Sequence, residues 1–299
     1  MGNSGRHVYG MFGLTVAAPC VLPGFDRVAG EGRADIEISL GRVDQPDAAT
    51  MTQLGPGLWA DEHSYRIDIA KLMRLRVSEG RTIVVEPMPA CDLAALPLFL
   101  LGSAVPAALI QRGFTLLRGT AIGWRGRPIA IVGRGSVGKS ALAVAMLRRG
   151  ATFWADDYLA LGPNDLLYPG AFRLTLWADM MRPLNFQRAE PLRPGLPRYG
   201  VQPPGVRENE PQPIEHFVHL SLTADAQAYG ELLTGVDRFH VLEQSAFLPQ
   251  MLAVARRRQA FFQRCATVSR GSKVSSLARQ RSGGDLAVLA DAVEALVQP

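Results

Sequence analysis

IAIVGRGSVGKS, residues 129–140, is the stretch that determines the fold of this chain. Four apolar residues lead into a glycine-rich loop that ends in Lys139 and Ser140. The loop fits G-x-x-x-x-G-K-[ST], the phosphate-binding P-loop or Walker A pattern. Its glycines let successive backbone N–H groups turn toward a phosphate, the lysine neutralises β- and γ-phosphate oxygens, and the serine hydroxyl can ligate Mg²⁺.

The flanking sequence supplies the context that a P-loop needs. Residues 128–132 are apolar and rich in β-branched types, and residues 140–149 are strong helix formers that end at Gly150, a natural residue after a helix. The free N–H groups and positive dipole end of that helix favour an anion at the loop. The residues predicted to bind the nucleotide are Gly133, Arg134, Gly135, Ser136, Val137, Gly138, Lys139, Ser140 and Ala141.

Two carboxylates follow the next apolar run. Residues 151–155 are mostly apolar and lead directly into Asp156 and Asp157. Ligands bind at the carboxyl ends of strands in an open parallel sheet, so these acids are expected to face the P-loop. Such a pair can hold Mg²⁺ and, in a kinase, accept the proton of the attacking hydroxyl. A solvated turn is the alternative, but the P-loop one helix earlier favours a metal site made of Ser140, Asp156 and Asp157.

Composition narrows the class of protein. The chain has 299 residues, 47% of them hydrophobic, and a formal net charge of +5. Its basic residues are scattered, which argues against a nucleic-acid partner. Its three cysteines lack metal-site or disulfide spacing. No signal-peptide core follows Met1, and no apolar run has the length of a membrane span, so we expect a cytoplasmic protein without a membrane partner.

The fold class is predicted to be α/β, a P-loop core preceded by a smaller, mostly β domain. Apolar and polar residues alternate in several runs before residue 92, which is typical of antiparallel strands with one wet face. We therefore place an N-terminal domain at 1–92 and a P-loop domain at 93–299. Within the latter, residues 183–213 are proline-rich and predict an irregular arm, whose Arg188, Arg193 and Arg198 could approach an acidic or phosphorylated partner. An amphipathic helix is expected over 285–297.

Several stretches resemble a known family. The sequence at 116–122, the P-loop and the segment 150–157 look like the kinase core of the HPr serine kinase/phosphorylase family. More narrowly, the chain is similar to the HPr-kinase-like proteins of lasso-peptide biosynthesis, in the stretches YGMFGL (9–14), LLG (100–102), QRG (111–113), PG (169–170) and RLTLW (173–177).

The resemblance implies ATP- and Mg²⁺-dependent transfer of a γ-phosphate to a serine hydroxyl of a peptide or protein, in the narrower group the end of a lasso precursor peptide. By position, Asp156 matches the general base and Asp157 its metal-side neighbour, while Lys139 and Ser140 keep their P-loop roles. The family usually has histidine where this chain has Arg118. Arginine cannot exchange a proton near neutral pH, but it can stabilise transferring phosphate charge. A homo-oligomer is also implied.

Two other functions stay open on the residues alone. A P-loop indicates a nucleotide but no particular reaction, and the guanine-reading N-K-x-D pattern is missing, which argues against a GTPase. The chain could be a nucleotide-binding regulatory or scaffold protein without phosphotransfer, for which Arg118 would mark the lost chemistry. It could also be a small-molecule kinase or ATPase.

Overall fold

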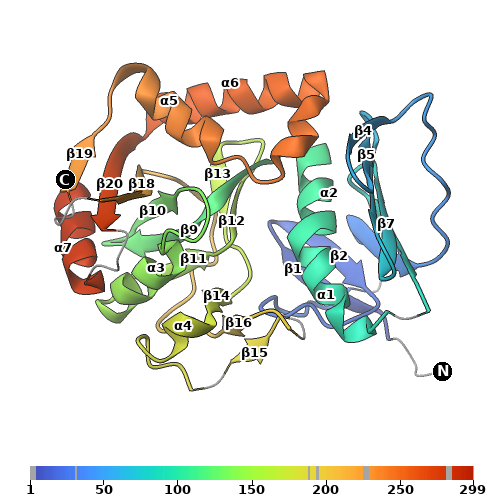
Figure 1. The fold of residues 1–299 in the computed structure, drawn as a ribbon, viewed down its shortest axis with the longest axis horizontal. Helices are drawn as coiled ribbons and strands as arrows, with labels where there is room; N and C mark the ends of the chain where they lie inside the picture. Colours follow the sequence, from blue (N-terminus) through green and yellow to red (C-terminus); the bar gives the residue numbers. More distant parts are fainter. Residues whose placement is uncertain are drawn as a thin grey trace. The chain divides into compact units, whose positions relative to one another are not determined.

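The structure is a computed structural model that describes residues 5–30, 32–89, 91–187, 189–192, 195–224, 229–280 and 285–298 (Figure 1). The chain divides into two compact units. Unit 1 comprises residues 1–115 and 248–261, and unit 2 comprises residues 116–247 and 262–299. This division differs from the predicted boundary at residue 92, because the helical segment after that residue packs on the sheet of unit 1.

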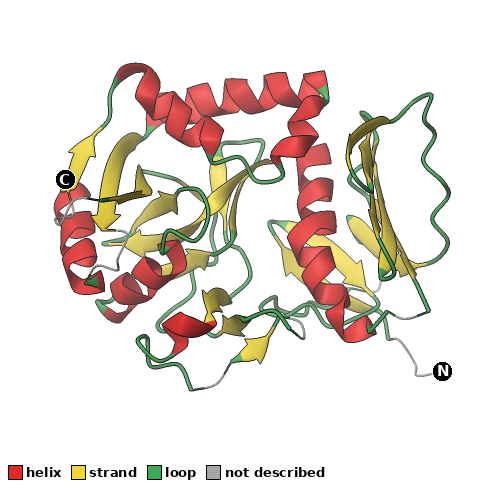
Figure 2. Cartoon of the chain, in the orientation of Figure 1, coloured by secondary structure: helices red, strands yellow, loops and turns green. Residues whose placement is uncertain are grey.

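Unit 1 is built on one eight-stranded mixed sheet in the order β1-β2-β3-β8-β7-β6-β5-β4. Strands are drawn in yellow in Figure 2. Its strands are β1 His7–Met11, β2 Leu14–Ala18, β3 Ile36–Leu40, β4 Thr52–Gly55, β5 Leu58–Ala60, β6 Ser64–Ile69, β7 Met73–Ser78 and β8 Thr82–Pro87. The predicted alternation is confirmed in β7, where Met73, Leu75 and Val77 are buried and the residues between them are more exposed. The pairs β2–β3 and β3–β8 are parallel, whereas the other neighbours are antiparallel.

A helical segment follows this sheet, as the sequence predicts. It consists of a 3-10 turn at Leu93–Ala95, α1 Leu96–Phe99, a π-helical turn at Leu100–Ala104 and α2 Val105–Gln111. The expectation that no apolar run has the length of a membrane span is wrong for this segment: Leu93–Gln111 is long and apolar enough to cross a membrane, with a mean hydropathy of 2.2. The same composition suits a core helix, and here α2 contacts β7 and β8 with Val105, Ala108 and Leu109 buried.

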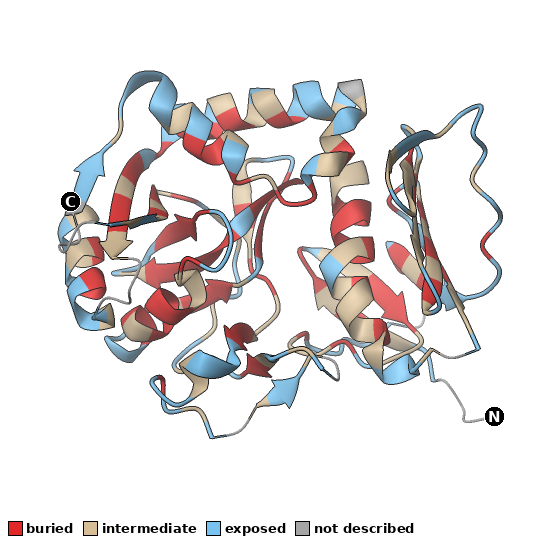
Figure 3. Ribbon diagram, viewed as in Figure 1, coloured by how far each residue is buried: buried red, intermediate tan, exposed pale blue. Residues whose placement is uncertain are grey.

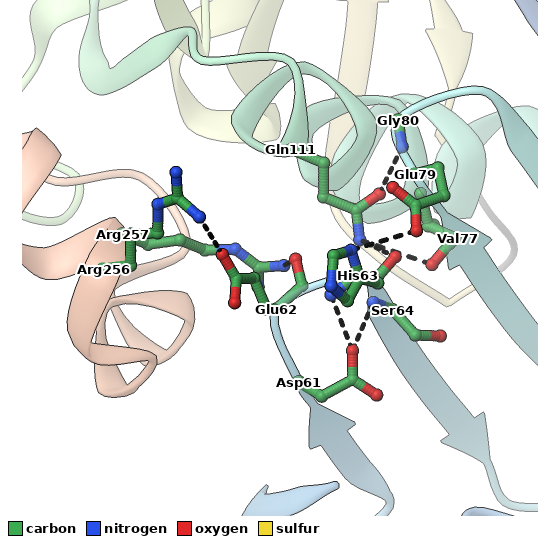
Figure 4. Close-up of polar contacts among 10 residues, drawn as sticks. All are labelled: Asp61, Glu62, His63, Ser64, Val77, Glu79, Gly80, Gln111, Arg256 and Arg257. Carbon is green, nitrogen blue, oxygen red and sulfur yellow. Dashed lines mark hydrogen bonds and ion pairs between the residues drawn. The ribbon is translucent and has the colours of Figure 1, made fainter. Parts of the chain in front are cut away.

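Polar contacts join residues 255–261 to the rest of unit 1, although these residues lie far from it in the sequence (Figure 4). Arg256 forms an ion pair with Glu62, and Arg257 donates a hydrogen bond to the Glu62 carbonyl oxygen at 2.6 Å. The adjoining turn is held by Gln111, whose side-chain oxygen accepts from Gly80 N at 2.7 Å and whose amide donates to the His63 carbonyl at 3.2 Å. These contacts explain why the first turns of α6, Ala255–Gly271, belong to unit 1.

Unit 2 contains a nine-stranded sheet in the order β17-β13-β12-β9-β10-β18-β20-β19, with β11 also paired to β9. Its strands are β9 Thr115–Trp124, β10 Arg127–Val132, β11 Thr152–Ala155, β12 Tyr158–Leu161, β13 Leu166–Tyr168, β17 Gln212–Pro213, β18 His216–Thr223, β19 Tyr229–Leu232 and β20 Lys273–Gln280. The sheet is mixed, whereas an open parallel sheet was expected. β10, β18 and β20 run parallel, and β11 shares their direction because β10 and β11 are both antiparallel to β9.

Helices complete unit 2. They are α3 Lys139–Arg148, α4 Ala178–Met181, α5 Gly235–Gln244, the remainder of α6, and α7 Leu286–Leu296. The predicted strand before the P-loop and helix after it are confirmed as β10 and α3, and the predicted C-terminal helix as α7. Side chains of α3 and α7 share one core with the sheet; β10 is buried except at Arg127, and α3 buries six of its ten residues (Figure 3).

A three-stranded sheet, β14-β16-β15, lies within unit 2. It consists of β14 Leu174–Trp177, β15 Glu190–Pro191 and β16 Arg198–Val201. The arm predicted at 183–213 as irregular therefore contributes β15, β16 and β17, because its prolines occupy short strands and turns. Of the three arginines singled out in the arm, Arg198 is described, whereas Arg188 and Arg193 lie outside the described residues.

Candidate functional site

A cleft of about 580 Å³ opens in unit 2 where β10 and β11 end. Because these strands share a direction, the loops that leave them meet at one edge of the sheet. The cleft is lined by Arg118, Gly119, Gly135, Ser136, Gly138, Lys139, Ser140, Ala141, Asp156, Asp157, Thr175, Leu176, Trp177, Ala178, Asp179, Met180, Pro197, Arg198 and Arg279.

The P-loop turns into α3 at Gly138, which precedes the helix with a φ of +99°. The Lys139 ammonium group donates hydrogen bonds to the carbonyl oxygens of Gly133 at 2.8 Å and Gly135 at 2.9 Å. These bonds hold the cation over its own loop, facing the cleft. Burial lowers the pKa of Lys139 to about 8, although the nearby Asp156 carboxylate raises it. An anion in the loop would restore the charged form.

The predicted nucleotide-binding residues divide into two groups. Six of them line the cleft, namely Gly135, Ser136, Gly138, Lys139, Ser140 and Ala141. Val137 instead packs into the hydrophobic core of unit 2, so it anchors the loop from behind. Gly133 and Arg134 are not among the lining residues.

Gly133 is required by the backbone. Its φ is +149°, and a Cβ there would lie 2.3 Å from the Leu220 carbonyl oxygen. Gly135 has a φ of +62°, but its Cβ would meet nothing within 4 Å. We expect Gly133→Ala to destabilise the protein by roughly 1–3 kcal/mol more than Gly135→Ala, because only the former adds a steric clash to backbone strain. Urea unfolding of the two variants measures the difference, and equal midpoints would contradict it.

Asp156 is the centre of the polar network. Its Oδ1 accepts hydrogen bonds from Thr120 Oγ1 and, at 2.8 Å, from Ser140 Oγ, and its Oδ2 accepts one from Thr175 N at 2.7 Å. Burial, followed by the adjacent Asp157 charge, raises the pKa of Asp156 to about 6, although these hydrogen bonds act in the opposite direction. The arrangement places an acid that titrates close to neutral pH against the serine of the P-loop.

Asp157 faces different partners. Its Oδ2 accepts a hydrogen bond from Thr175 Oγ1 at 2.8 Å, and its Oδ1 pairs with the Arg198 guanidinium at 3.1 Å. The residue has a φ of +69°, in the left-handed region. The two acids of the predicted metal site thus differ in their partners, since Asp156 contacts Ser140 whereas Asp157 is paired with an arginine.

The donor set suits Mg²⁺ held mainly by a nucleotide. Within the described ranges, no group of three or more His, Cys, Asp or Glu side chains could hold a metal ion. Mg²⁺ keeps several waters and takes one or two protein oxygens beside substrate phosphates, so it does not need such a group. Ser140 Oγ and Asp156 Oδ1, 2.8 Å apart, are hard oxygen donors of the required kind.

Arg118 lines the cleft and is the exposed residue of β9, whose neighbouring residues are buried. Its guanidinium lies over the Phe247 ring, 4.8 Å from the centroid. Arginine binds phosphate through several donors in one plane, and here an aromatic face supports it from behind. The position that the resemblance assigns to a family histidine therefore carries a fixed positive charge.

Further residues that contact the acids or the P-loop were not predicted as site residues. Thr120 and Thr175 hydrogen-bond the acids, and Trp177 Nε1 donates to Ser136 Oγ at 3.0 Å. Thr120, Thr175 and Trp177 stand in stretches that carry the family resemblance, which is the one signal that the sequence offered for them. Arg279 had no signal, because it is distant in sequence from every motif.

Comparisons with known proteins found likenesses among solved structures alone. No protein-family model matches the chain, and a search of curated proteins found no match. Among 66 matching chains of solved structures is the Hpr(Ser) kinase/phosphatase from Coxiella burnetii, which is 10% identical with a TM-score of 0.29. That match covers 60% of this chain and 95% of the other. The likeness is distant, so the function must be argued from the residues of the cleft.

Proposed function

We propose that this protein is a kinase that transfers the γ-phosphate of ATP to a serine hydroxyl of a peptide or small protein. One observation carries the proposal: Ser140 of the P-loop lies 2.8 Å from Asp156, in the cleft that also receives Lys139. Phosphoryl transfer needs a phosphate cradle, a metal-holding hydroxyl and a carboxylate in one place. The contacts between these residues support all three requirements.

The chemistry follows from the roles of these side chains. The serine oxygen of the acceptor bonds to the γ-phosphorus, the bond from that phosphorus to the β–γ bridging oxygen breaks, and ADP leaves. Asp156 orients the hydroxyl and accepts its proton, while Lys139 and Arg118 offset the developing charge. Mg²⁺, when held by Ser140 and an acid, neutralises charge on the β- and γ-phosphates.

The acceptor is proposed from the sequence resemblance. The stretches shared with HPr-kinase-like proteins of lasso-peptide biosynthesis favour a lasso precursor peptide that ends in serine. The same resemblance supports a homo-oligomer, and the cytoplasmic location stays a prediction from the sequence.

A second candidate is a nucleotide-binding regulatory protein without phosphotransfer. The ion pair between Arg198 and Asp157 favours it, because it neutralises one of the two acids. Arg118 favours it as well, because arginine cannot exchange protons near neutral pH.

Mass spectrometry separates the two candidates. Purified protein, ATP and Mg²⁺ are incubated with a precursor peptide that ends in serine, beside an Asp156→Asn control. We expect the peptide to gain one phosphate, about 80 Da, with the unmutated protein only. An unmodified peptide despite bound nucleotide would favour the regulatory protein or a different acceptor.

The pH dependence of transfer offers an independent check. Because the pKa of Asp156 is raised to about 6, the carboxylate needed as a base is lost as pH falls through that value. Bound Mg²⁺ stabilises the carboxylate and moves the fall to lower pH. We therefore expect kcat to rise with pH, with a midpoint at or below about 6, and then to level off. Rates measured between pH 5 and 8 that decrease with pH would contradict this assignment.

A further inference from the structure

We infer that Arg279 is a further phosphate-binding residue of this cleft, which contacts the phosphate chain of the nucleotide beside the P-loop. The inference deepens the proposed function and depends on the nucleotide-binding part of it. It does not depend on the identity of the acceptor.

Strand direction brings Arg279 to the cleft. β20 is parallel to β18, which in turn is parallel to β10, so the carboxyl ends of all three strands meet at the edge where the P-loop begins. Arg279 is the next-to-last residue of β20 and lines the cleft. It is 140 residues beyond Lys139 in the chain, and the sheet brings the two together.

The guanidinium lies against the P-loop itself. A Cβ added to Gly138 would lie 2.3 Å from Arg279 Nη1, so the absence of a side chain at Gly138 makes room for the arginine. Gly138 immediately precedes α3, where backbone N–H groups of a P-loop cradle phosphates. A phosphate bound at this helix start would therefore lie next to Arg279.

Arg279 also lacks a partner among the described residues. The structure shows no hydrogen bond or ion pair from its side chain, and its Nε is buried without an acceptor. The other cations of the cleft have contacts of their own: Lys139 bonds its loop carbonyl oxygens, Arg198 pairs with Asp157, and Arg118 lies over the Phe247 ring. A buried donor without a partner is costly, so Arg279 is positioned to gain most from an incoming anion. A nucleoside diphosphate or triphosphate is the anion that the loop beside it is built to receive.

Calorimetric titration with MgADP and MgATP tests this inference on the full chain. The variants are Arg279→Ala, Arg279→Lys and Arg279→Met, the last of which keeps bulk but removes charge. Arg127→Ala is the matched control, since Arg127 pairs with Glu215 at the opposite end of β10. We expect Arg279→Ala and Arg279→Met to lower the affinity for both nucleotides about tenfold or more, and Arg279→Lys to lower it less. Arg127→Ala should leave the affinity unchanged.

Thermal unfolding without nucleotide distinguishes binding from packing. Without nucleotide, we expect Arg279→Met to unfold at or above the temperature of the wild type, because this variant keeps the bulk of the side chain and removes a buried donor that has no partner among the described residues. If Arg279→Met binds nucleotide like the wild type, the arginine only packs the loop and the inference is wrong. Suppose that the wild type and all Arg279 variants bind nucleotide and that Lys139→Ala does not bind it. In that case the inference about Arg279 fails and the proposed function stands. If the wild type binds none, both it and the proposed function fail.

Discussion

Replacing Lys139 with alanine is expected to abolish detectable nucleotide binding and, with it, every nucleotide-dependent activity. The ammonium group is held over the P-loop by the Gly133 and Gly135 carbonyl oxygens, and no other lysine lines the cleft. The substitution removes the positive charge that is expected to contact the β- and γ-phosphates. Removing one such group from an active site typically costs about 100-fold or more in rate. Fluorescence titration with an ATP analogue measures the loss.

Lys273→Ala is the matched control for this prediction. The chain has three lysines, and Lys273 is the first residue of β20, at the opposite end of the strand from the cleft. We expect that variant to bind ATP like the wild type. Lys139→Ala should also keep its fold, because the lysine bonds only to its own loop. Unchanged ATP affinity in Lys139→Ala would mean that the P-loop motif does not bind nucleotide here.

Asp156→Asn is expected to keep nucleotide binding but to reduce phosphotransfer by about 10²–10⁴-fold, the usual contribution of a positioned general base. The amide has the shape of the carboxylate and can still accept from Thr120 and Ser140, so the network around it is preserved in large part. It cannot accept the proton of the acceptor hydroxyl. Single-turnover transfer beside an ATP titration separates the two effects.

Asp157→Asn provides the comparison. Asp157 pairs with Arg198 and does not contact Ser140, so we expect its loss to reduce the transfer rate less than the loss of Asp156. Transfer by Asp156→Asn at the wild-type rate would show that the base is assigned wrongly. If Asp156→Asn loses Mg²⁺-dependent binding while Asp157→Asn loses transfer, the two acids have exchanged roles.

Local patterns of sequence predicted much of unit 2. The apolar run before Gly133 became β10, the helix formers after Lys139 became α3, and the acids after Ala155 lie in the bend that follows β11, because each depends on residues close in the chain. Alternation likewise predicted β7, since the period of a strand is visible within a few residues. The meeting of Ser140 with Asp156 followed from the general rule that strand ends share an edge.

Contacts between residues far apart in the chain were decided only by the tertiary structure. Sequence patterns placed the first boundary at residue 92, whereas the packing of α2 on β7 and β8 moved it to 115 and brought 248–261 into unit 1. The same holds in the cleft, where Arg198 reaches Asp157 across 41 positions and Arg279 reaches Gly138 through the order of the strands. The sequence by itself determined the phosphate loop and its acids, because their spacing is local. The cations and hydroxyl groups that surround them were decided by the topology of the sheet. No periodicity along the chain predicts that topology.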